Sequence, residues 1–179
     1  FVHFPIKSEF AWGGGDKELV STINLAESKY KEILMDRPDY SPYIYFLFYN
    51  QTDPETFQKW AVRYPDDSEG FQHVKSFKNL TFKKVDWSDD IAIPNRLIDK
   101  RLLVSWAEST PAGATASSLL VDKFILNKIT EKFNQPFGLE PGDIVENRLI
   151  KTIYLKNGNP LFYLIEINKI VKNELYDAE

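Results

Sequence analysis

The sequence predicts a single α+β domain over residues 1–179, with a largely antiparallel sheet of about six or seven strands, three helices and a C-terminal β-hairpin. Three observations lead to this prediction. An Asn-Gly pair separates two long, mostly apolar runs near the C-terminus. Apolar residues recur at helical spacing in three separate segments. Several short strand-like runs follow one another directly, which favours antiparallel neighbours.

The hairpin is expected over residues 148–171, turning at Asn157 and Gly158. Asn-Gly favours a two-residue type I′ turn because both central residues of that turn need positive φ. Counting outward from it predicts these cross-strand pairs: Tyr154 with Leu161, Ile153 with Phe162, Thr152 with Tyr163, Lys151 with Leu164, Ile150 with Ile165, Leu149 with Glu166, Arg148 with Ile167, and Glu146 with Lys169. The face that includes Tyr154 is expected to meet the core, whereas the other becomes polar away from the turn. Pro160 lacks an N–H, so we expect no third strand beside it and a free edge there for a partner.

Helices are expected at residues 16–34, 54–64 and 121–133. The first follows a flexible joint, Gly13-Gly14-Gly15, and Asp16 is its N-cap. Asp53 and Pro54 supply the cap and first position of the second helix, which Pro65 ends. Each helix carries an apolar stripe, as expected of a helix that lies on a sheet.

Further strands are expected at residues 1–10, 43–49, 72–77, 80–87 and 96–106. The run over 43–49 is unbroken, apolar and aromatic, which is typical of a central strand covered on both faces. The first strand is interrupted by Pro5, and a flexible N-terminal arm over residues 1–15 is the alternative.

Composition excludes several classes of function. A net charge of −4 with scattered lysines and arginines argues against a nucleic-acid-binding surface. The chain has no cysteine, which removes disulfides and thiolate chemistry. No apolar run is long enough to span a membrane, and no signal peptide is visible, so we expect a soluble protein of unassigned compartment. The start at Phe1 indicates a processed protein or an excised segment.

No residue pattern indicates a metal, a cofactor or a catalytic group, and we expect none of them. His3 and His73 are far apart in the sequence, and the acidic clusters at 66–69 and 89–90 lack the ligand spacing of a calcium loop. Ser117 and Ser118 have no visible base. The small-residue stretch 110–118 precedes a predicted helix, whose N-terminus could receive an anion, although a connector is the favoured interpretation.

One segment resembles a known family. Residues 139–164, LEPGDIVENRLIKTIYLKNGNPLFYL, are similar to the closing segment of the UTRA and chorismate-lyase-like effector-binding domains. Those domains place a helix and a G-x-P hairpin on an antiparallel sheet. Where the family carries arginines before the turn this chain has Thr152 and Tyr154, and the acidic residue expected after the turn is displaced to Glu166. The resemblance implies a pocket for a small molecule.

Two functional interpretations follow. The first is a non-catalytic binding or assembly module that contacts a protein partner, or a second copy of itself, through aromatic side chains. Aromatic residues reach 15% of the chain, and Tyr and Trp are common anchors of interfaces. The expected interaction residues are Trp12, Trp60 and Trp87.

The second interpretation is a small-molecule binding domain or enzyme with a pocket between the sheet and the helices. Its ligand is expected to be a small anion held by arginine guanidinium groups. The expected ligand-binding residues are Arg96, Arg101, Arg148 and Trp106.

Overall fold

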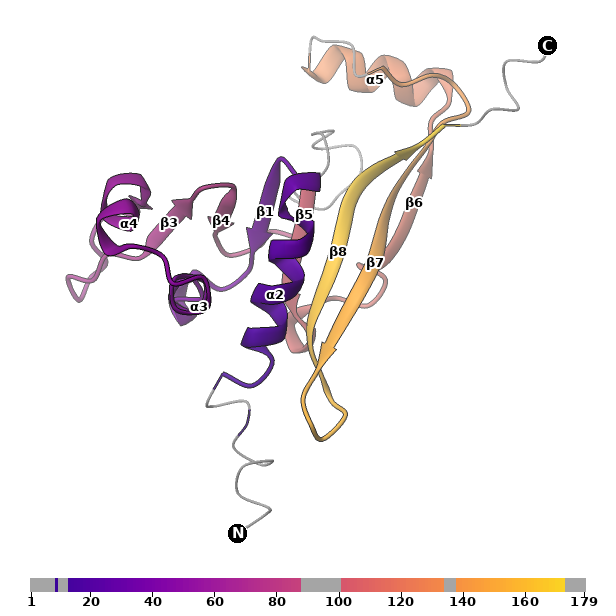
Figure 1. Ribbon diagram of the computed structural model, residues 1–179. Coiled ribbons are helices and arrows are strands. Elements are labelled where there is room, and N and C mark those ends of the chain that lie inside the picture. Colours follow the sequence, from indigo (N-terminus) through magenta and orange to yellow (C-terminus); the bar gives the residue numbers. More distant parts are fainter. Residues whose placement is uncertain (1–8, 10–12, 88–100, 134–137, 173–179) are drawn as a thin grey trace.

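The computed structural model describes residues 9, 13–87, 101–133 and 138–172 (Figure 1). The α-helices are α2 (Asp16–Ala26), α3 (Tyr43–Tyr49), α4 (Pro54–Trp60) and α5 (Lys123–Phe133), with 3-10 helices η2 (Glu27–Lys29), η3 (Pro38–Tyr40) and η4 (Ala107–Ser109). The strands are β1 (Glu32–Met35), β2 (Val62–Arg63), β3 (Val74–Phe77), β4 (Leu80–Phe82), β5 (Arg101–Trp106), β6 (Ala116–Leu120), β7 (Ile144–Tyr154) and β8 (Pro160–Val171). The predicted α+β class and the C-terminal hairpin are confirmed.

All eight described strands belong to one sheet, in the order β2-β3-β4-β1-β5-β8-β7-β6. The middle strand β1 runs parallel to both of its neighbours, with Ile33 opposite Leu80 on one side and Leu102 on the other. Every other pairing in this sheet is antiparallel. The sheet is therefore largely antiparallel, as predicted, with a short parallel section at its centre.

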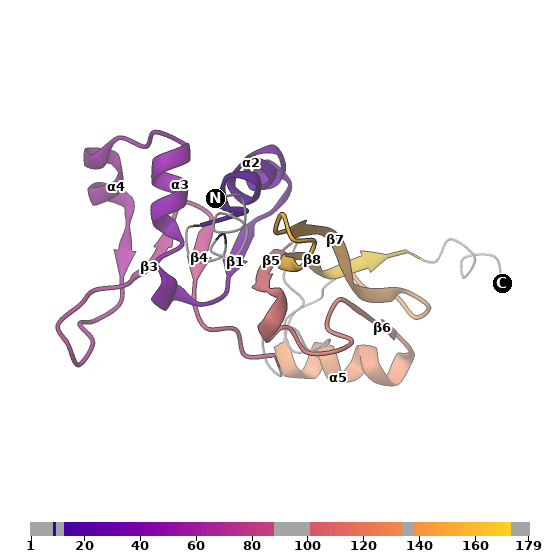
Figure 2. The same ribbon diagram turned by 90° about the horizontal axis from the view of Figure 1, so that it is seen from below.

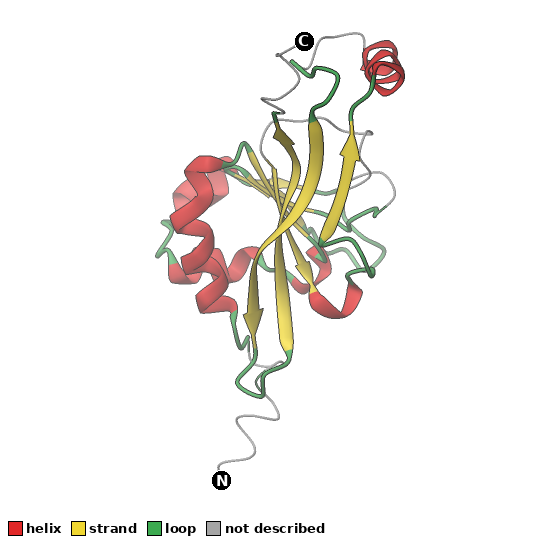
Figure 3. Cartoon of the chain, turned by 90° about the vertical axis from the view of Figure 1, so that its right-hand side faces the viewer, coloured by secondary structure: helices red, strands yellow, loops and turns green. Residues whose placement is uncertain are grey.

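The two faces of the sheet carry different cores. The larger core lies on the face covered by α2, α3 and α4, which gather along one side of the sheet (Figure 3). It joins Ile23 of α2 and Phe46 of α3 to Ile33, Phe82 and Leu164 of the sheet. The smaller core, on the opposite face, consists of Leu34, Val85, Leu103, Ile165 and Ile167, with Trp87 and Tyr163 packed against it.

Helix α5 stands apart from the other helices. Viewed from below, it lies on the opposite side of the sheet from α2–α4, near β6 (Figure 2). It packs through Ile125 and Leu126 onto a third, small core of Val121, Leu139 and Val145. This end of the molecule is thus stabilised by its own apolar contacts.

The first predicted helix is shorter than expected. Helix α2 ends at Ala26, and Ile33 and Leu34 belong to β1. These two adjacent side chains are fully buried in different cores, on opposite faces of the sheet. Successive side chains alternate between the two faces in a strand and not in a helix. The prediction of helix over residues 33–34 is wrong because both faces of β1 are apolar, so that a helical spacing of apolar residues arises there by coincidence.

The predicted central strand over residues 43–49 is wrong, because these residues form α3. Phe46 is buried and Tyr43 and Leu47 pack against the large core, whereas Ile44 and Phe48 are exposed. One face of α3 is therefore buried and the other exposed, although apolar or aromatic residues occupy both faces. An uninterrupted apolar run carries no periodicity that separates a helix from a strand.

Three further boundaries differ from the prediction. Helix α4 begins as predicted, with the side chain of Asp53 accepting a hydrogen bond from the N–H of Thr56, but it ends at Trp60 and the extended Ala61 leads into β2. The predicted strands over 72–77 and 80–87 are shorter, as β3 and β4. The stretch 110–118 does not open onto a helix, since β6 intervenes and α5 begins only at Lys123. The predicted strand over 1–10, all but residue 9, lies outside the described residues, as does the start of the strand predicted over 96–106.

The hairpin is confirmed, but its turn is not the predicted type I′. The loop holds three residues, because the N–H of Leu155 donates to the carbonyl of Asn159 and the N–H of Gly158 donates to that of Leu155. Gly158 has φ 84, whereas Asn157 keeps a negative φ and accepts the N–H of Asn159 through its side chain. This is the turn in which a left-handed residue follows a type I turn.

The predicted register holds in part. The pairs Lys151 with Leu164, Thr152 with Tyr163, Ile153 with Phe162 and Glu146 with Lys169 are confirmed. The observed pairs Tyr154 with Pro160, Leu149 with Ile165 and Arg148 with Glu166 replace the predicted ones. The pairing of β7 with β8 skips one residue of β7 near Ile150, which shifts the register by one. A second shift compensates for the first, so that the predicted register is restored at Glu146.

Both faces of the hairpin contribute to a core. Leu161, Ile165 and Ile167, on the face expected to meet the core, are buried, the first in the large core and the other two in the smaller one. The opposite face, expected to become polar away from the turn, also enters the large core through Phe162 and Leu164. Pro160 agrees with expectation in one respect. Strand β5 lies beside β8, but its pairing stops at Phe162, before it reaches the proline.

The loop geometry yields a stability prediction. Gly158→Ala is expected to destabilise the protein by about 1–2 kcal/mol, because a Cβ at positive φ is strained, although no atom lies within 4 Å of it. Gly158→Asn should lose less, since asparagine tolerates this conformation better. Urea unfolding would show a lower midpoint with an unchanged slope. Lys156→Ala, in the same loop, is the matched control, and equal midpoints for G158A and the wild type would contradict the turn assignment.

Candidate functional site

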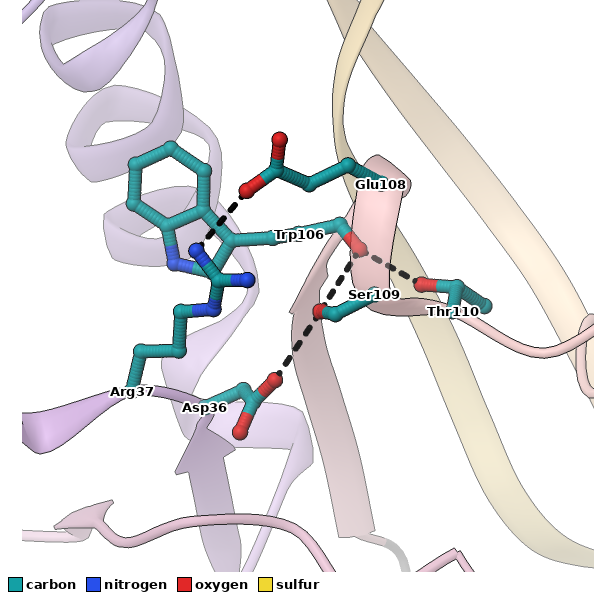
Figure 4. Close-up of polar contacts among 6 residues, drawn as sticks. All are labelled: Asp36, Arg37, Trp106, Glu108, Ser109 and Thr110. Carbon is teal, nitrogen blue, oxygen red and sulfur yellow. Dashed lines mark hydrogen bonds and ion pairs between the residues drawn. The ribbon is translucent and has the colours of Figure 1, made fainter.

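The strongest constellation of polar and aromatic side chains lies where the parallel strands end. Strands β1, β4 and β5 run in the same direction, so their carboxyl ends meet at one edge of the sheet. Ligands of open sheets with parallel strands bind preferentially outside such ends. Six residues that follow β1 or close β5 come together there: Asp36, Arg37, Trp106, Glu108, Ser109 and Thr110 (Figure 4). We call this cluster the carboxyl edge.

Asp36 holds the carboxyl edge together. Its side chain is only 5% exposed, and its N–H donates to the carbonyl of Val104 in β5. One carboxylate oxygen accepts the N–H of Val85, 3.0 Å away, and the other accepts the hydroxyl of Ser109 at 3.3 Å. A single buried carboxylate therefore connects the segments that follow β1, β4 and β5, and its oxygens are occupied by these structural contacts.

Arg37 is the partly exposed cation of this edge. Its guanidinium carbon lies 5.5 Å from the ring centre of Tyr40 and 5.8 Å from that of Trp106, within the range of cation–π attraction. Its Nη1 also forms an ion pair of 2.8 Å with Glu108. Trp106 is fixed from behind by Phe162, with ring centres 4.8 Å apart. The guanidinium is thus oriented by two rings and one carboxylate while remaining partly exposed.

The backbone around Arg37 is strained. Arg37 has φ 59 and Ser41 has φ 50, a conformation that non-glycine residues rarely adopt. Residues held in this region cost on the order of 1–3 kcal/mol each and tend to occur at functional sites. The hydroxyl of Thr110 donates to the carbonyl of Trp106 at 2.8 Å, and the single hydroxyl proton of Ser109 is shared between that carbonyl at 3.2 Å and Asp36 at 3.3 Å, which fixes the far side of the edge.

The predicted ligand-binding residues do not converge. Arg101 is 1% exposed and its Nε contacts Glu32 at 2.7 Å, at the opposite end of the same strands from the carboxyl edge. Arg148 is exposed on β7, opposite Glu166. Because Glu166 is opposite Leu102, the alternation of β5 places Arg101 and Arg148 on opposite faces of the sheet. Trp106 belongs to the carboxyl edge, and Arg96 lies outside the described residues.

The predicted interaction residues are also dispersed. Trp60 ends α4 and is 62% exposed. Trp87 packs against the smaller core, and Trp12 lies outside the described residues. Sequence reasoning did not find Arg37, Tyr40 or Glu108, because residues 33 and 34 were assigned to a helix. A strand at that position would have drawn attention to the polar residues directly after it.

A second surface feature concerns α3, α4 and β2. Seven of the fifteen exposed large hydrophobic side chains of the described residues lie between residues 40 and 71. They are Tyr40, Ile44, Phe48, Tyr49, Trp60, Val62 and Phe71. We call this segment, residues 40–71, the aromatic lobe. Phe48 is the most exposed of them at 72%, and Ile44 lies one helical turn before it.

The helices of the aromatic lobe are firmly placed. Tyr43 of α3 stacks on Phe57 of α4 with ring centres 5.6 Å apart and the planes 9° from parallel. The side chains of Asn24 and Asn50 exchange hydrogen bonds of 2.7 and 3.3 Å, which join α2 to the end of α3. The exposed side chains of α3 and α4 are therefore presented by helices that contact each other and, through α3, contact α2.

The described residues contain no group of three or more His, Asp or Glu side chains arranged to hold a metal ion. The acidic loop 66–69, whose spacing does not fit a calcium loop, forms an internal turn in which one oxygen of Asp67 accepts the N–H groups of Glu69 and Phe71. These bonds lower the pKa of Asp67, and His73 contacts its other oxygen at 3.3 Å. Within the same part of the chain, no helix is long and apolar enough to cross a membrane.

Comparison with known proteins adds no assignment. No family model matches the chain, and neither a curated protein nor a solved structure matches it. The resemblance of residues 139–164 to the UTRA and chorismate-lyase-like domains therefore remains a prediction from the sequence. Function has to be inferred from the geometry of this chain alone.

Asp16 yields a pH prediction. This residue is the first of α2 and not its N-cap as predicted, because Gly15 occupies the cap position and no side chain caps the helix. Asp16 is 7% exposed, and burial raises its pKa to about 7. The folded state therefore holds a proton that the unfolded chain has already lost between pH 4 and pH 7, so stability should fall as the pH rises through that window. We expect Asp16→Asn to remove this fall and to exceed the wild type in stability above pH 7 by about 2–4 kcal/mol.

Chemical denaturation at several pH values would measure this effect. Asp67→Asn is the matched control of opposite sign, because a lowered carboxylate pKa contributes stability that is lost on acidification. Parallel profiles for D16N and the wild type between pH 4 and pH 8 would show that the Asp16 carboxylate is not desolvated.

Proposed function

We propose that the domain is a non-catalytic binding module that contacts a protein partner through the aromatic lobe. The observation that carries this proposal is the concentration of exposed large hydrophobic side chains between residues 40 and 71. Isolated exposed hydrophobic residues are normal on protein surfaces, whereas large contiguous apolar patches mark interaction sites. Contact between α3 and α4, through Tyr43 and Phe57, supports such a patch. Phe48 and Trp60 are the anchors, since aromatic side chains contribute most of the binding energy at interfaces.

The charge of the aromatic lobe narrows the partner chemistry. The segment 40–71 carries five acidic residues, Asp53, Glu55, Asp66, Asp67 and Glu69, against two basic ones, Lys59 and Arg63, for a net charge of −3. A partner that offers apolar side chains surrounded by lysine or arginine complements this surface. The rigid placement of α3 and α4 supports binding because little conformational entropy is lost when their side chains are covered.

The polar groups of the carboxyl edge support binding over catalysis. Ser109 and Thr110 donate their hydroxyls to the carbonyl of Trp106, and both oxygens of Asp36 accept structural hydrogen bonds. A hydroxyl nucleophile would need a neighbouring base to remove its proton. In the described part of this edge, the acidic groups are engaged by Arg37, Ser109 and the N–H of Val85 instead.

A photo-crosslinking residue at position 48 would test the aromatic lobe. With p-benzoylphenylalanine there, irradiation in the cells that make the protein is expected to give a discrete cross-linked product. In the chain without the photo-reactive residue, Phe48→Ser should abolish the complex with the partner. The same change should alter the free energy of unfolding by less than about 0.5 kcal/mol, because the side chain is exposed. The same photo-reactive residue at position 124, exposed on α5, is the control. No product at position 48, or identical products at both positions, would refute the proposal.

A second candidate function is binding of a small anion at the carboxyl edge, and Arg37 is the observation that favours it. Its side chain is 27% exposed and its guanidinium is already oriented by two rings, so it could exchange Glu108 for a ligand carboxylate or phosphate. Arginine is suited to such bidentate recognition. The aromatic faces of Tyr40 and Trp106 would flank the ligand.

Removal of the competing carboxylate tests this second function. Glu108→Gln is expected to strengthen binding of phosphate or citrate by about tenfold, since Arg37 no longer has to break an ion pair. Arg37→Met should abolish it. Arg63→Met is the control, because that guanidinium also lies over a ring, 5.7 Å from the centre of Phe57, but away from the edge. NMR titration of the Trp106 indole would report binding, and an unchanged affinity in E108Q would exclude this site.

A further inference from the structure

The end strand β6 presents an open edge. It is the last strand of the described sheet and pairs only with β7, from Ala116 opposite Arg148 to Leu120 opposite Ile144. Four of its five residues are exposed, and Leu119 is half-buried. Its position at one margin of the sheet is visible in Figure 1. The outer backbone groups of β6 are therefore accessible to another strand.

The hydrogen bonds to β7 show which backbone groups point outward. The carbonyl of Thr115 accepts the N–H of Leu149, and the N–H of Val121 donates to the carbonyl of Asp143. In an antiparallel ladder, hydrogen-bonded and non-hydrogen-bonded positions alternate. Odd-numbered residues of β6 therefore bond to β7, and the backbone groups of Ala116, Ser118 and Leu120 point toward the open edge.

The β6 edge lacks the usual protection against pairing. Exposed edge strands are normally protected by charged side chains, prolines or bulges. The five residues of β6, Ala-Ser-Ser-Leu-Leu, include neither a charge nor a proline, and the pairing of β6 with β7 has no register shift. The opposite margin is different, because β2 has two residues, carries Arg63 and pairs irregularly with β3.

We propose that β6 pairs with β6 of a second copy of this chain, antiparallel about a two-fold axis at Ser118. Ser118 then lies opposite Ser118 of the second copy, and Ala116 lies opposite Leu120. This register uses all three outward-pointing residues of each copy. Ser118 and Leu120 supply four N–H donors across the axis, whereas the N–H of Ala116 already donates to the carbonyl of Gly113.

The side chains fit a second copy of the same strand. An isologous interface must be self-complementary, and like charges that face each other across it would oppose association. The paired span contains only alanine, serine and leucine, so no like charges meet. The exposed Leu120 would be covered by the small Ala116 of the other copy. Glu146, beside Ser118 on β7, is paired with Lys169 at 3.9 Å within its own chain.

Charged substitutions of Ser118, which lies at the proposed two-fold axis, test this dimer. Sedimentation velocity of the complete wild-type chain is expected to show a monomer–dimer equilibrium at high protein concentration. Ser118→Lys and Ser118→Glu each place like charges opposite one another and should weaken self-association by about tenfold or more. An equimolar mixture of S118K and S118E should recover the dimer, which also shows that both variants remain folded.

Leu25→Lys, exposed on α2 and outside both β6 and the aromatic lobe, is the matched control and should associate like the wild type. A wild-type chain that stays monomeric at millimolar concentration would overturn the proposal. So would a dimer that S118K leaves unchanged, or a mixture of S118K and S118E that remains monomeric. Because β6 lies outside residues 40–71, these outcomes are independent of the cross-linking test at position 48.

Discussion

The fold depends on the insertion of β1 between β4 and β5. Among the described strands, this four-residue strand alone runs parallel to both of its neighbours, and it buries Ile33, Leu34 and Met35 almost completely. Its alternate side chains enter the two cores, so a single strand connects the helix-covered face to the opposite face. Both sets of ladder hydrogen bonds and both cores would be lost together if β1 were displaced, which makes it the most constrained element of the sheet.

The same constraint creates the carboxyl edge. Three strands that end side by side leave their last carbonyl and amide groups near one another, and these groups need partners. Asp36 satisfies part of that requirement, because its buried carboxylate accepts the N–H of Val85 and its backbone N–H donates to the carbonyl of Val104. The chain then has to leave the sheet abruptly, and it does so through the left-handed Arg37. The partly exposed Arg37 guanidinium is therefore positioned by the turn that the chain makes at the end of β1.

The sequence predicted local structure where a local chemical signal exists. Asp53-Pro54 marked the start of α4, and Asn157-Gly158 marked the hairpin, although the three-residue loop required positive φ only at Gly158. The central elements were misassigned for a common physical reason. Residues buried on every side, as in β1, or a helix that is aromatic on both sides, as in α3, show no contrast between faces, and periodicity is then uninformative. The carboxyl edge was missed as a consequence, because it depends on knowing where β1 ends.

The aromatic content of the chain has two separate uses. Phe46, Phe77, Phe82 and Phe162 are buried in the large core, where each ring removes a large apolar area from water. Phe48, Trp60 and Phe71 are exposed, and no packing requirement within the described structure accounts for them. Exposed apolar area promotes non-specific association unless it is matched to a partner. These exposed side chains contribute little to the packing of the described structure, and binding is the role that we propose for them. The uncharged β6 edge, at the far end of the same sheet, is also prone to association, because the outward-pointing backbone groups of an edge strand can pair with another strand.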